Sequence, residues 1–143
     1  MKRHEWVLLV IAAAGGEGLS PVQLQKSLFL IRQNCKRAVG PGFYKFIPFD
    51  YGPFNPDIYS DAEDLEAEGL VTISRRPGQR WVEYAATPKG IERARSLEED
   101  LPEPVVTYIR EVVAWARRQS FNQLVSAIYQ QYPEYRKNSV FQH

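Results

Sequence analysis

Residues 49–90 constrain the fold of this 143-residue chain more than any other stretch. Asn55 and Pro56 suit the cap and the first position of a helix, and Gly69 supplies its C-terminal stop. After Leu70, β-branched residues follow at positions 71–73. Residues 76–79 then read Arg-Pro-Gly-Gln, which fits a type II turn because glycine accepts the positive φ of the third position. The stretch therefore predicts a helix followed by a β-hairpin.

The end of this stretch completes the pattern. A return strand at residues 80–86 carries Trp81 and Tyr84, and Thr87 with Pro88 begins another helix as its cap and first residue. A helix, a two-stranded hairpin and a new helix in this order are typical of the third helix and wing of a winged-helix domain. We expect an α+β fold in which residues 1–100 form a winged helix-turn-helix domain.

Two further helices are expected before this stretch. Residues 5–14 are apolar on almost every side, which predicts a helix in the middle of the domain. Ser20, Pro21 and Gln23 form a capping box that begins a second helix, and glycines at positions 40 and 42 end it. Residues 43–49 are aromatic and predict a short edge strand, because Pro48 cannot donate to a ladder.

Residues 101–143 predict a C-terminal helical extension of the same domain. Pro102 and Pro104 start one helix, and Ser120 with Gln123 repeats the capping box at the start of another. We expect these two helices to form an antiparallel hairpin, an appendage through which such domains often form homodimers.

Charge and cysteine content narrow the classes of function. A formal net charge of +1 predicts no strong overall attraction to nucleic acid, so any electrostatic binding has to be local. The single cysteine, Cys35, lies on an apolar helix face and favours an inert thiol in a cytoplasmic protein. The N-terminus imitates a signal peptide, but Glu5 interrupts it and its apolar run is short. We expect a retained core helix and no membrane span.

Patterns of catalysis are missing from the sequence. His4 and His143 lie near the chain ends, and neither a Ser-His-acid spacing nor a phosphate-binding glycine loop is present. Asp57, Asp61 and Asp64 lie near one helix face, but such spacing is more common on a solvated face than at a metal site. We expect a protein that is not an enzyme and uses no cofactor or metal.

Two short motifs resemble those of the SocA-like antitoxins that carry the Panacea domain, and residues 113–135 are similar to that family's closing helices. The matching residues are Leu24, Gln25, Lys26 and Leu28 in the first motif and Gly52, Pro53, Pro56 and Tyr59 in the second. Phe54 departs from the family's usual valine, and the well-formed wing is more like that of a winged-helix regulator. The resemblance implies a prokaryotic regulatory protein that binds a partner protein, as antitoxin or adaptor.

The basic residues of the hairpin form a candidate nucleic-acid site. Arg75, Arg76 and Arg80 cluster at its tip, where arginines bind phosphates or enter a minor groove, and Lys89 and Lys26 could add contacts. The alternative is a hairpin tip that is charged only because it is solvated.

The helix before the hairpin favours a protein partner instead. Residues 55–69 hold six acidic and no basic side chains, so phosphates would repel this helix and it is a poor reader of the major groove. We take Asp61, Asp64 and Glu68 as candidate protein contacts. The aromatic residues of positions 43–54 are a second candidate surface, represented by Phe46, Tyr51 and Phe54, although core packing explains them equally simply.

These patterns leave two hypotheses. The first is a non-enzymatic regulator that acts through a partner protein, such as a toxin or a protease target, by its acidic helix and aromatic edge. The second is a winged-helix transcriptional regulator that contacts double-stranded DNA through its basic wing.

Overall fold

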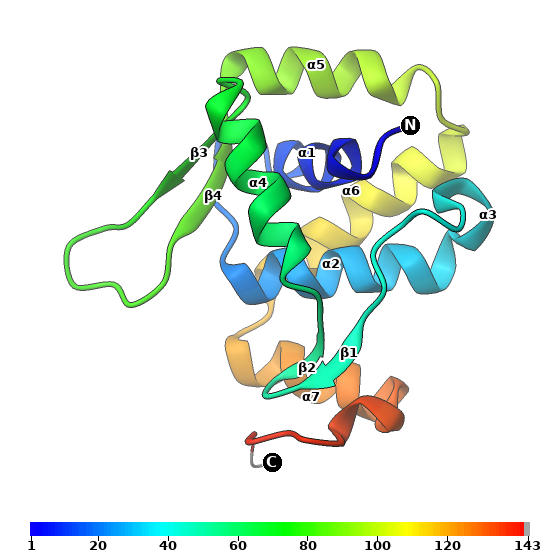
Figure 1. The fold of residues 1–143 in the computed structure, drawn as a ribbon, viewed down its shortest axis with the longest axis vertical. Coiled ribbons are helices and arrows are strands. Elements are labelled where there is room, and N and C mark those ends of the chain that lie inside the picture. Colours follow the sequence, from blue (N-terminus) through cyan, green and yellow to red (C-terminus); the bar gives the residue numbers. More distant parts are fainter. Residues whose placement is uncertain (142–143) are drawn as a thin grey trace.

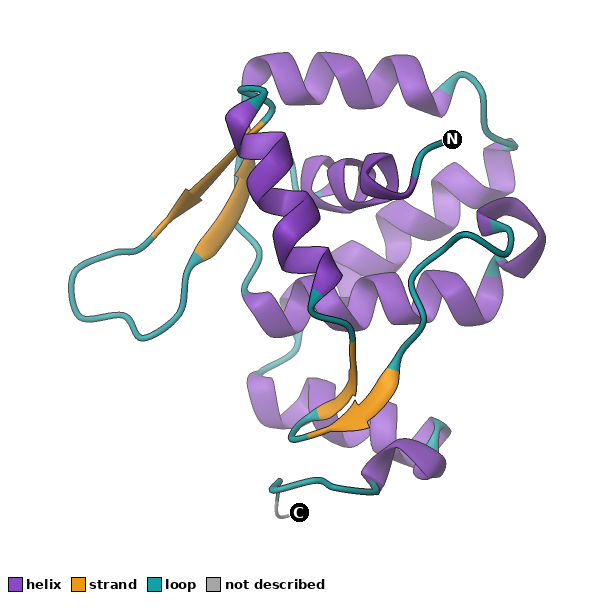
Figure 2. Ribbon diagram, in the orientation of Figure 1, coloured by secondary structure: helices purple, strands orange, loops and turns teal. Residues whose placement is uncertain are grey.

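The structure, a computed structural model, describes residues 1–141; Gln142 and His143, the end of the expected C-terminal extension, lie outside the described residues. The chain folds as α+β, with helices around two small antiparallel hairpins (Figure 2). The helices are α1 (Arg3–Ala13), α2 (Pro21–Asn34), α3 (Lys36–Val39), α4 (Asp57–Ala67), α5 (Pro88–Glu98), α6 (Glu103–Arg118) and α7 (Phe121–Gln131), followed by the 3-10 turn η1 (Pro133–Arg136). The strands are β1 (Ile47–Phe49), β2 (Gly52–Phe54), β3 (Val71–Ser74) and β4 (Glu83–Ala86).

Helix α1 is the centre of the hydrophobic core. Every side chain from Trp6 to Ile11 is buried, as expected for a helix that is apolar on almost every side. Helices α2, α4, α5 and α6 all pack against it, so the core is enclosed from several directions (Figure 1). The expected central position of this helix is confirmed.

Local capping explains where the helices begin. The hydroxyl of Ser20 accepts a hydrogen bond from the Gln23 amide at 3.2 Å, and Ser120 repeats this with Gln123 at 3.1 Å. The expected capping boxes are confirmed at both helices. At α4 the side chain of Asn55 accepts from the Asp57 amide at 2.8 Å, so this residue caps the helix as expected although Pro56 intervenes.

The hairpin of β3 and β4, which we call the wing, has the expected turn. Val71 faces Ala86 in the register, Gly78 has a φ of 83°, and the Gln79 amide bonds to the Arg76 carbonyl at 3.0 Å. These features confirm the type II turn. The return strand is shorter than predicted, because residues 80–82 belong to the loop; the wing projects from the body of the molecule (Figure 1).

The other hairpin differs from the expectation of one edge strand. Strand β1 begins only at Ile47 and pairs with β2, a partner that the sequence did not predict. Pro48 faces Pro53 in this ladder. Antiparallel strands contain facing pairs that exchange no hydrogen bonds, and such a pair suits two prolines because proline has no N–H. Asp50 and Tyr51 form the two-residue connection.

The expected antiparallel hairpin of the last two helices is wrong. Helix α6 packs against α1 and α2 and places Ile109 and Val113 in the core. Helix α7 packs instead against α2, β2 and η1 (Figure 1). Each helix has its own apolar face, and α2 offers a surface to both of them. The hairpin was the pattern from which a homodimer was expected, so that expectation loses its support.

Candidate binding cleft

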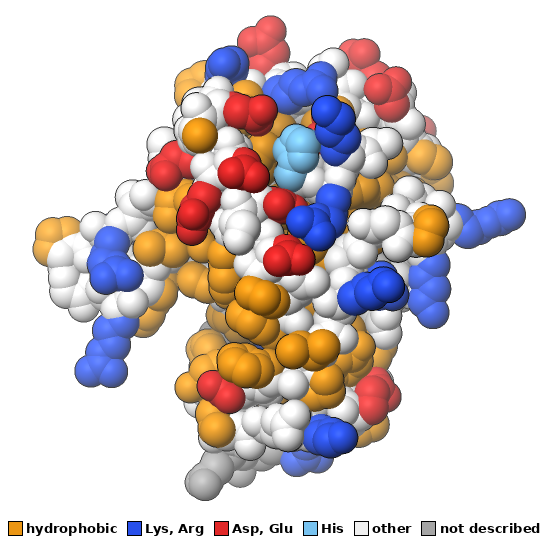
Figure 3. Space-filling model, viewed as in Figure 1, with side chains coloured by type: hydrophobic (Ala, Val, Ile, Leu, Met, Phe, Trp, Pro, Cys, Tyr) orange, Lys and Arg blue, Asp and Glu red, His pale blue; other side chains and the backbone are white. Residues whose placement is uncertain are grey.

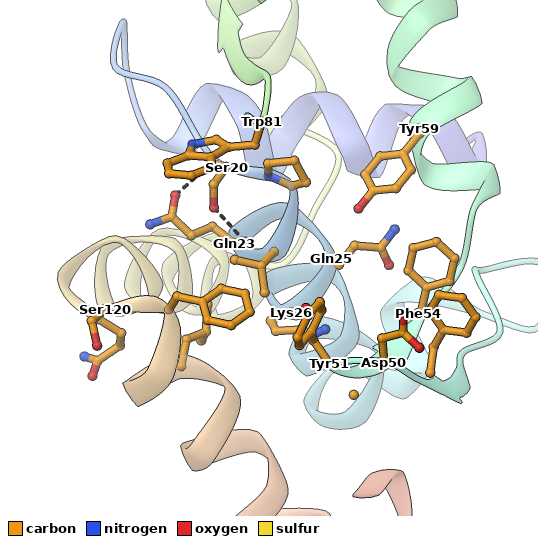
Figure 4. A pocket seen from close by; sticks show the side chains of 17 residues that line it. Ser20, Gln23, Gln25, Lys26, Asp50, Tyr51, Phe54, Tyr59, Trp81 and Ser120 are labelled. Atoms are coloured by element: carbon orange, nitrogen blue, oxygen red, sulfur yellow. Dashed lines mark hydrogen bonds between the residues drawn. The ribbon is translucent and has the colours of Figure 1, made fainter. Parts of the chain in front are cut away.

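An open cleft of about 590 Å³ lies where five parts of the chain meet. The start of α2, the β1–β2 connection, α4, the wing and the α6–α7 junction each contribute to its walls. Its principal side chains are Lys26, Tyr51, Phe54, Tyr59, Trp81 and Phe121. The first five are labelled in Figure 4 and lie around one space. The site is therefore assembled from segments far apart in the sequence.

Large aromatic side chains form the rim of this cleft. Tyr51, Trp81 and Phe121 are 44%, 49% and 43% exposed, respectively, which is unusual for side chains of this size. The rings of Tyr51 and Phe121 meet edge to face with their centroids 5.0 Å apart, so the β1–β2 connection is joined to the start of α7. The rim is an exposed apolar surface that a partner could cover.

A line of stacked rings continues from the cleft towards the wing. Phe54 stacks on Phe49 at 4.8 Å and lies 5.9 Å from Tyr59, which in turn stacks on Tyr84 at 6.2 Å. Burial raises the pKa of Tyr59, and it raises the pKa of Tyr84 to about 12, so both phenols remain neutral at physiological pH. These ring contacts link the β1–β2 hairpin, α4 and the wing.

Lys26 lies inside the cleft and is 3% exposed. Its Nζ donates a hydrogen bond to the Pro53 carbonyl at 3.2 Å, and burial lowers the pKa of its amine to about 7. Arg75, Arg76 and Arg80 do not line this cleft, so the position of Lys26 does not support the prediction that it joins them in one phosphate-binding site.

The two motifs that resemble the SocA-like family contact one another. Gln25 donates to the Asn55 carbonyl at 2.8 Å and accepts from the Asn55 amide at 3.0 Å. The Lys26–Pro53 bond lies next to this pair. The "LQK" segment of α2 thus fixes the entry to α4, which gives a physical reason for the two motifs to occur together.

Asp61 is a structural residue, and the prediction that it contacts a partner is wrong. It is 9% exposed, its Oδ2 lies 3.0 Å from the Arg3 guanidinium, and it accepts a hydrogen bond from the Tyr44 hydroxyl. Burial and the Asp61 hydrogen bond both raise the pKa of Tyr44. Asp61 is buried because it falls on the apolar stripe of α4, three residues after Ile58.

The other acidic candidates remain on the surface. Asp64 and Glu68 are exposed on α4, where Figure 3 shows acidic side chains above an apolar area. Phe46, in contrast, is half-buried and packs edge to face on Phe29 at 5.4 Å, so it fills the core and does not line the cleft.

The wing keeps its three arginines together and exposed. Arg76 forms a 3.5 Å ion pair with Glu83, and Arg75 and Arg80 have no such pair within residues 1–141. Lys89 lies elsewhere, since its Nζ donates to the Glu68 carbonyl at the end of α4 at 3.2 Å. The predicted basic site is therefore reduced to the three arginines.

Other chemistry finds little support in the described part of the chain. Across residues 1–141, no three His, Cys, Asp or Glu side chains gather closely enough to hold a metal ion. Cys35 is half-buried, and burial raises the pKa of its thiol, the opposite of what a reactive thiolate requires. No helix in this range has the length and apolar character needed to cross a membrane.

Sequence analysis missed Trp81 and Phe121 as site residues. Each was read as part of a local element, and no pattern in the sequence indicates that the wing and the start of α7 meet. Neither the protein-family models nor the curated proteins contain a match to this chain. The resemblance to the SocA-like antitoxins therefore rests on its two motifs and on residues 113–135.

Proposed function

We propose that this chain is a non-enzymatic regulatory protein that acts by binding a segment of a partner protein in the aromatic cleft. The observation that carries the proposal is the exposure of Tyr51, Trp81 and Phe121 around one cleft. Tyrosine and tryptophan are enriched among residues that dominate protein–protein binding energy, and they offer a large contact area with few rotatable bonds.

The surroundings of the cleft suit a protein ligand. The Gln25–Asn55 hydrogen bonds and the Tyr51–Phe121 ring contact join α2, the entry to α4, the β1–β2 connection and the start of α7, so this part of the site is preorganised. The exposed carboxylates of Asp64 and Glu68 belong to α4, the helix that also contributes Tyr59 to the wall. We propose that they steer a partner with basic residues outside the bound segment.

The wing supports a second candidate function, DNA binding by a winged-helix regulator. Arg75 and Arg80 are exposed and unpaired within residues 1–141, as phosphate-binding side chains must be. The acidic surface of α4 argues against insertion of that helix into a groove, so contact would be made by the wing.

An affinity pull-down from native lysate with nuclease treatment separates the two. The proposal expects a protein that survives nuclease, is retained by the Arg75→Glu/Arg80→Glu variant, and is lost with Trp81→Ala/Phe121→Ala. Recovery of DNA alone, abolished by the arginine changes, would contradict the proposal and support the second candidate.

A further inference from the structure

Within residues 1–141, the buried amine of Lys26 has no carboxylate partner. Its amine has one hydrogen-bond acceptor among the described residues, the Pro53 carbonyl, although an ammonium group carries three donors. Burial alone accounts for the lowered pKa of this amine, with no contribution from a carboxylate. A buried ammonium without an anionic partner is unfavourable, so an anionic ligand in the cleft would stabilise the charged form of this amine.

Lys26 belongs to the wall of the cleft, although the residue is only 3% exposed. A Cβ built on Gly52 would lie 3.7 Å from Lys26 Nζ, so the lack of a side chain at Gly52 leaves space next to the amine. Figure 4 shows Lys26 beside Tyr51, with Trp81 and Tyr59 further along the space. The cation is therefore placed beneath the aromatic rim.

Asp50, the acidic residue of the cleft wall, does not neutralise Lys26. No ion pair joins the two within residues 1–141. The backbone of Asp50 is held in place, because its carbonyl accepts from the Val140 amide at 3.0 Å and from the Ser139 hydroxyl at 3.3 Å. The connection that carries Asp50 is thus fixed in a position that forms no ion pair with Lys26 within residues 1–141.

We propose that the cleft recognises a segment of the partner protein in which an acidic side chain lies between apolar residues. The carboxylate pairs with Lys26, and the flanking apolar side chains pack on Tyr51, Trp81 and Phe121. This inference rests on the proposed function and specifies the chemistry of its ligand. Charge complementarity and the apolar rim together define the occupant.

An acidic side chain fits better than the carboxylate at a chain end. Terminal carboxylates are commonly captured by free backbone N–H groups. At the two helix starts in this cleft, the amides of Ser20 and Gln23 and those of Ser120 and Gln123 are already bonded within their capping boxes. An acidic side chain can instead extend from a peptide bound at the rim to the amine of Lys26.

Paired peptide pools test the inference without knowledge of the natural partner. Blocked peptides, acetylated and amidated, carry a central Glu or Gln flanked by positions randomised among Leu, Phe, Tyr, Ala and Ser. The mixed pools are passed over immobilised wild-type protein, Lys26→Met and Trp81→Ala, and enrichment is read by mass spectrometry. A third pool has a central Gln and a free C-terminal carboxylate.

The expected result is that wild-type protein enriches Glu peptides about tenfold over their Gln twins, the factor that about 1.4 kcal/mol of pairing free energy supplies. Lys26→Met should bring this ratio close to one. Because the Glu–Gln comparison is made on the wild-type protein, it does not depend on the folding of a variant. Equal enrichment, a preference that survives Lys26→Met, or a preference for the free C-terminus would overturn the inference.

The same data separate failure of the inference from failure of the proposed function. Apolar peptides enriched regardless of their central residue, and lost with Trp81→Ala, would overturn the acidic specificity and leave the cleft as a peptide site. Absence of enrichment for every pool would count against both.

Discussion

Gly52 lies against the side chain of Lys26. A Cβ at Gly52 would be 3.6 Å from Lys26 Cε and 3.3 Å from the ring of Tyr129, and the φ of Gly52 is 108°. The residue therefore combines a backbone conformation that favours glycine with a close approach by two side chains. This relationship links the shape of the β1–β2 connection to the position of the buried amine.

Gly52→Ala should destabilise the protein by about 1–3 kcal/mol, because alanine is strained at this φ and its methyl group presses on Tyr129. Urea unfolding measures the loss. Gly42→Ala is the matched control, since no atom lies within 4 Å of its added Cβ and its φ is unstrained; its effect should stay within about 0.5 kcal/mol. Equal effects of the two changes would show that Gly52 is not constrained as described.

Lys26→Met should be more stable than the wild type at neutral pH, and this advantage should shrink as pH rises. The amine has a pKa of about 7 in the folded state against an ordinary 10.5. Between these values the unfolded chain binds more protons than the folded one, so wild-type stability increases with pH. The difference between variant and wild type should fall by about 1.4 kcal/mol per pH unit in that window.

Unfolding of both proteins in urea from about pH 6.5 to about pH 9.5 checks this prediction. The other ionisable groups around Lys26 are Asp50, Tyr51, Tyr59 and Tyr129, and they are common to both proteins, so their direct contributions cancel in the difference. A difference that does not change with pH would mean that Lys26 keeps an ordinary pKa and is not buried as a lone cation.

Asp61→Ala should cost about 2–3 kcal/mol, whereas Asp64→Ala should cost less than about 0.5 kcal/mol. The first change removes the acceptor of the Tyr44 hydroxyl and the partner of the Arg3 guanidinium at the edge of the core. The second alters an exposed side chain on the same helix. Thermal unfolding compares the two variants directly. An Asp61→Ala variant as stable as the wild type would show that Asp61 is a free surface carboxylate.

The sequence was sufficient to predict several of the local elements. The capping boxes at Ser20 and Ser120, the glycine turn at Gly78 and the central position of α1 depend on residues close in the chain. Periodicity and capping report such local choices, and the structure agrees with them. The direction in which α7 packs is not a local choice, and there the prediction failed.

The candidate site was predictable only in part. Tyr51 and Phe54 were identified as aromatic surface residues, but Trp81 and Phe121 join them through contacts between distant segments. Composition also gave no indication that Lys26 and Asp61 are buried, because charged residues are rarely buried without a specific reason. For Asp61 that reason is the Arg3 and Tyr44 partners, and for Lys26 we propose that it is a ligand.

The central claim is tested most directly by titrating the purified partner from the pull-down into wild-type protein and two variants. Trp81→Ala/Phe121→Ala should weaken binding by tenfold or more, as loss of aromatic residues at a binding centre usually does, by about 1.4 kcal/mol or above. Arg75→Glu/Arg80→Glu should leave the affinity within about threefold, since the wing arginines lie outside the cleft. The reverse pattern, with binding lost only in the arginine variant, would contradict the account and identify the wing as the functional site.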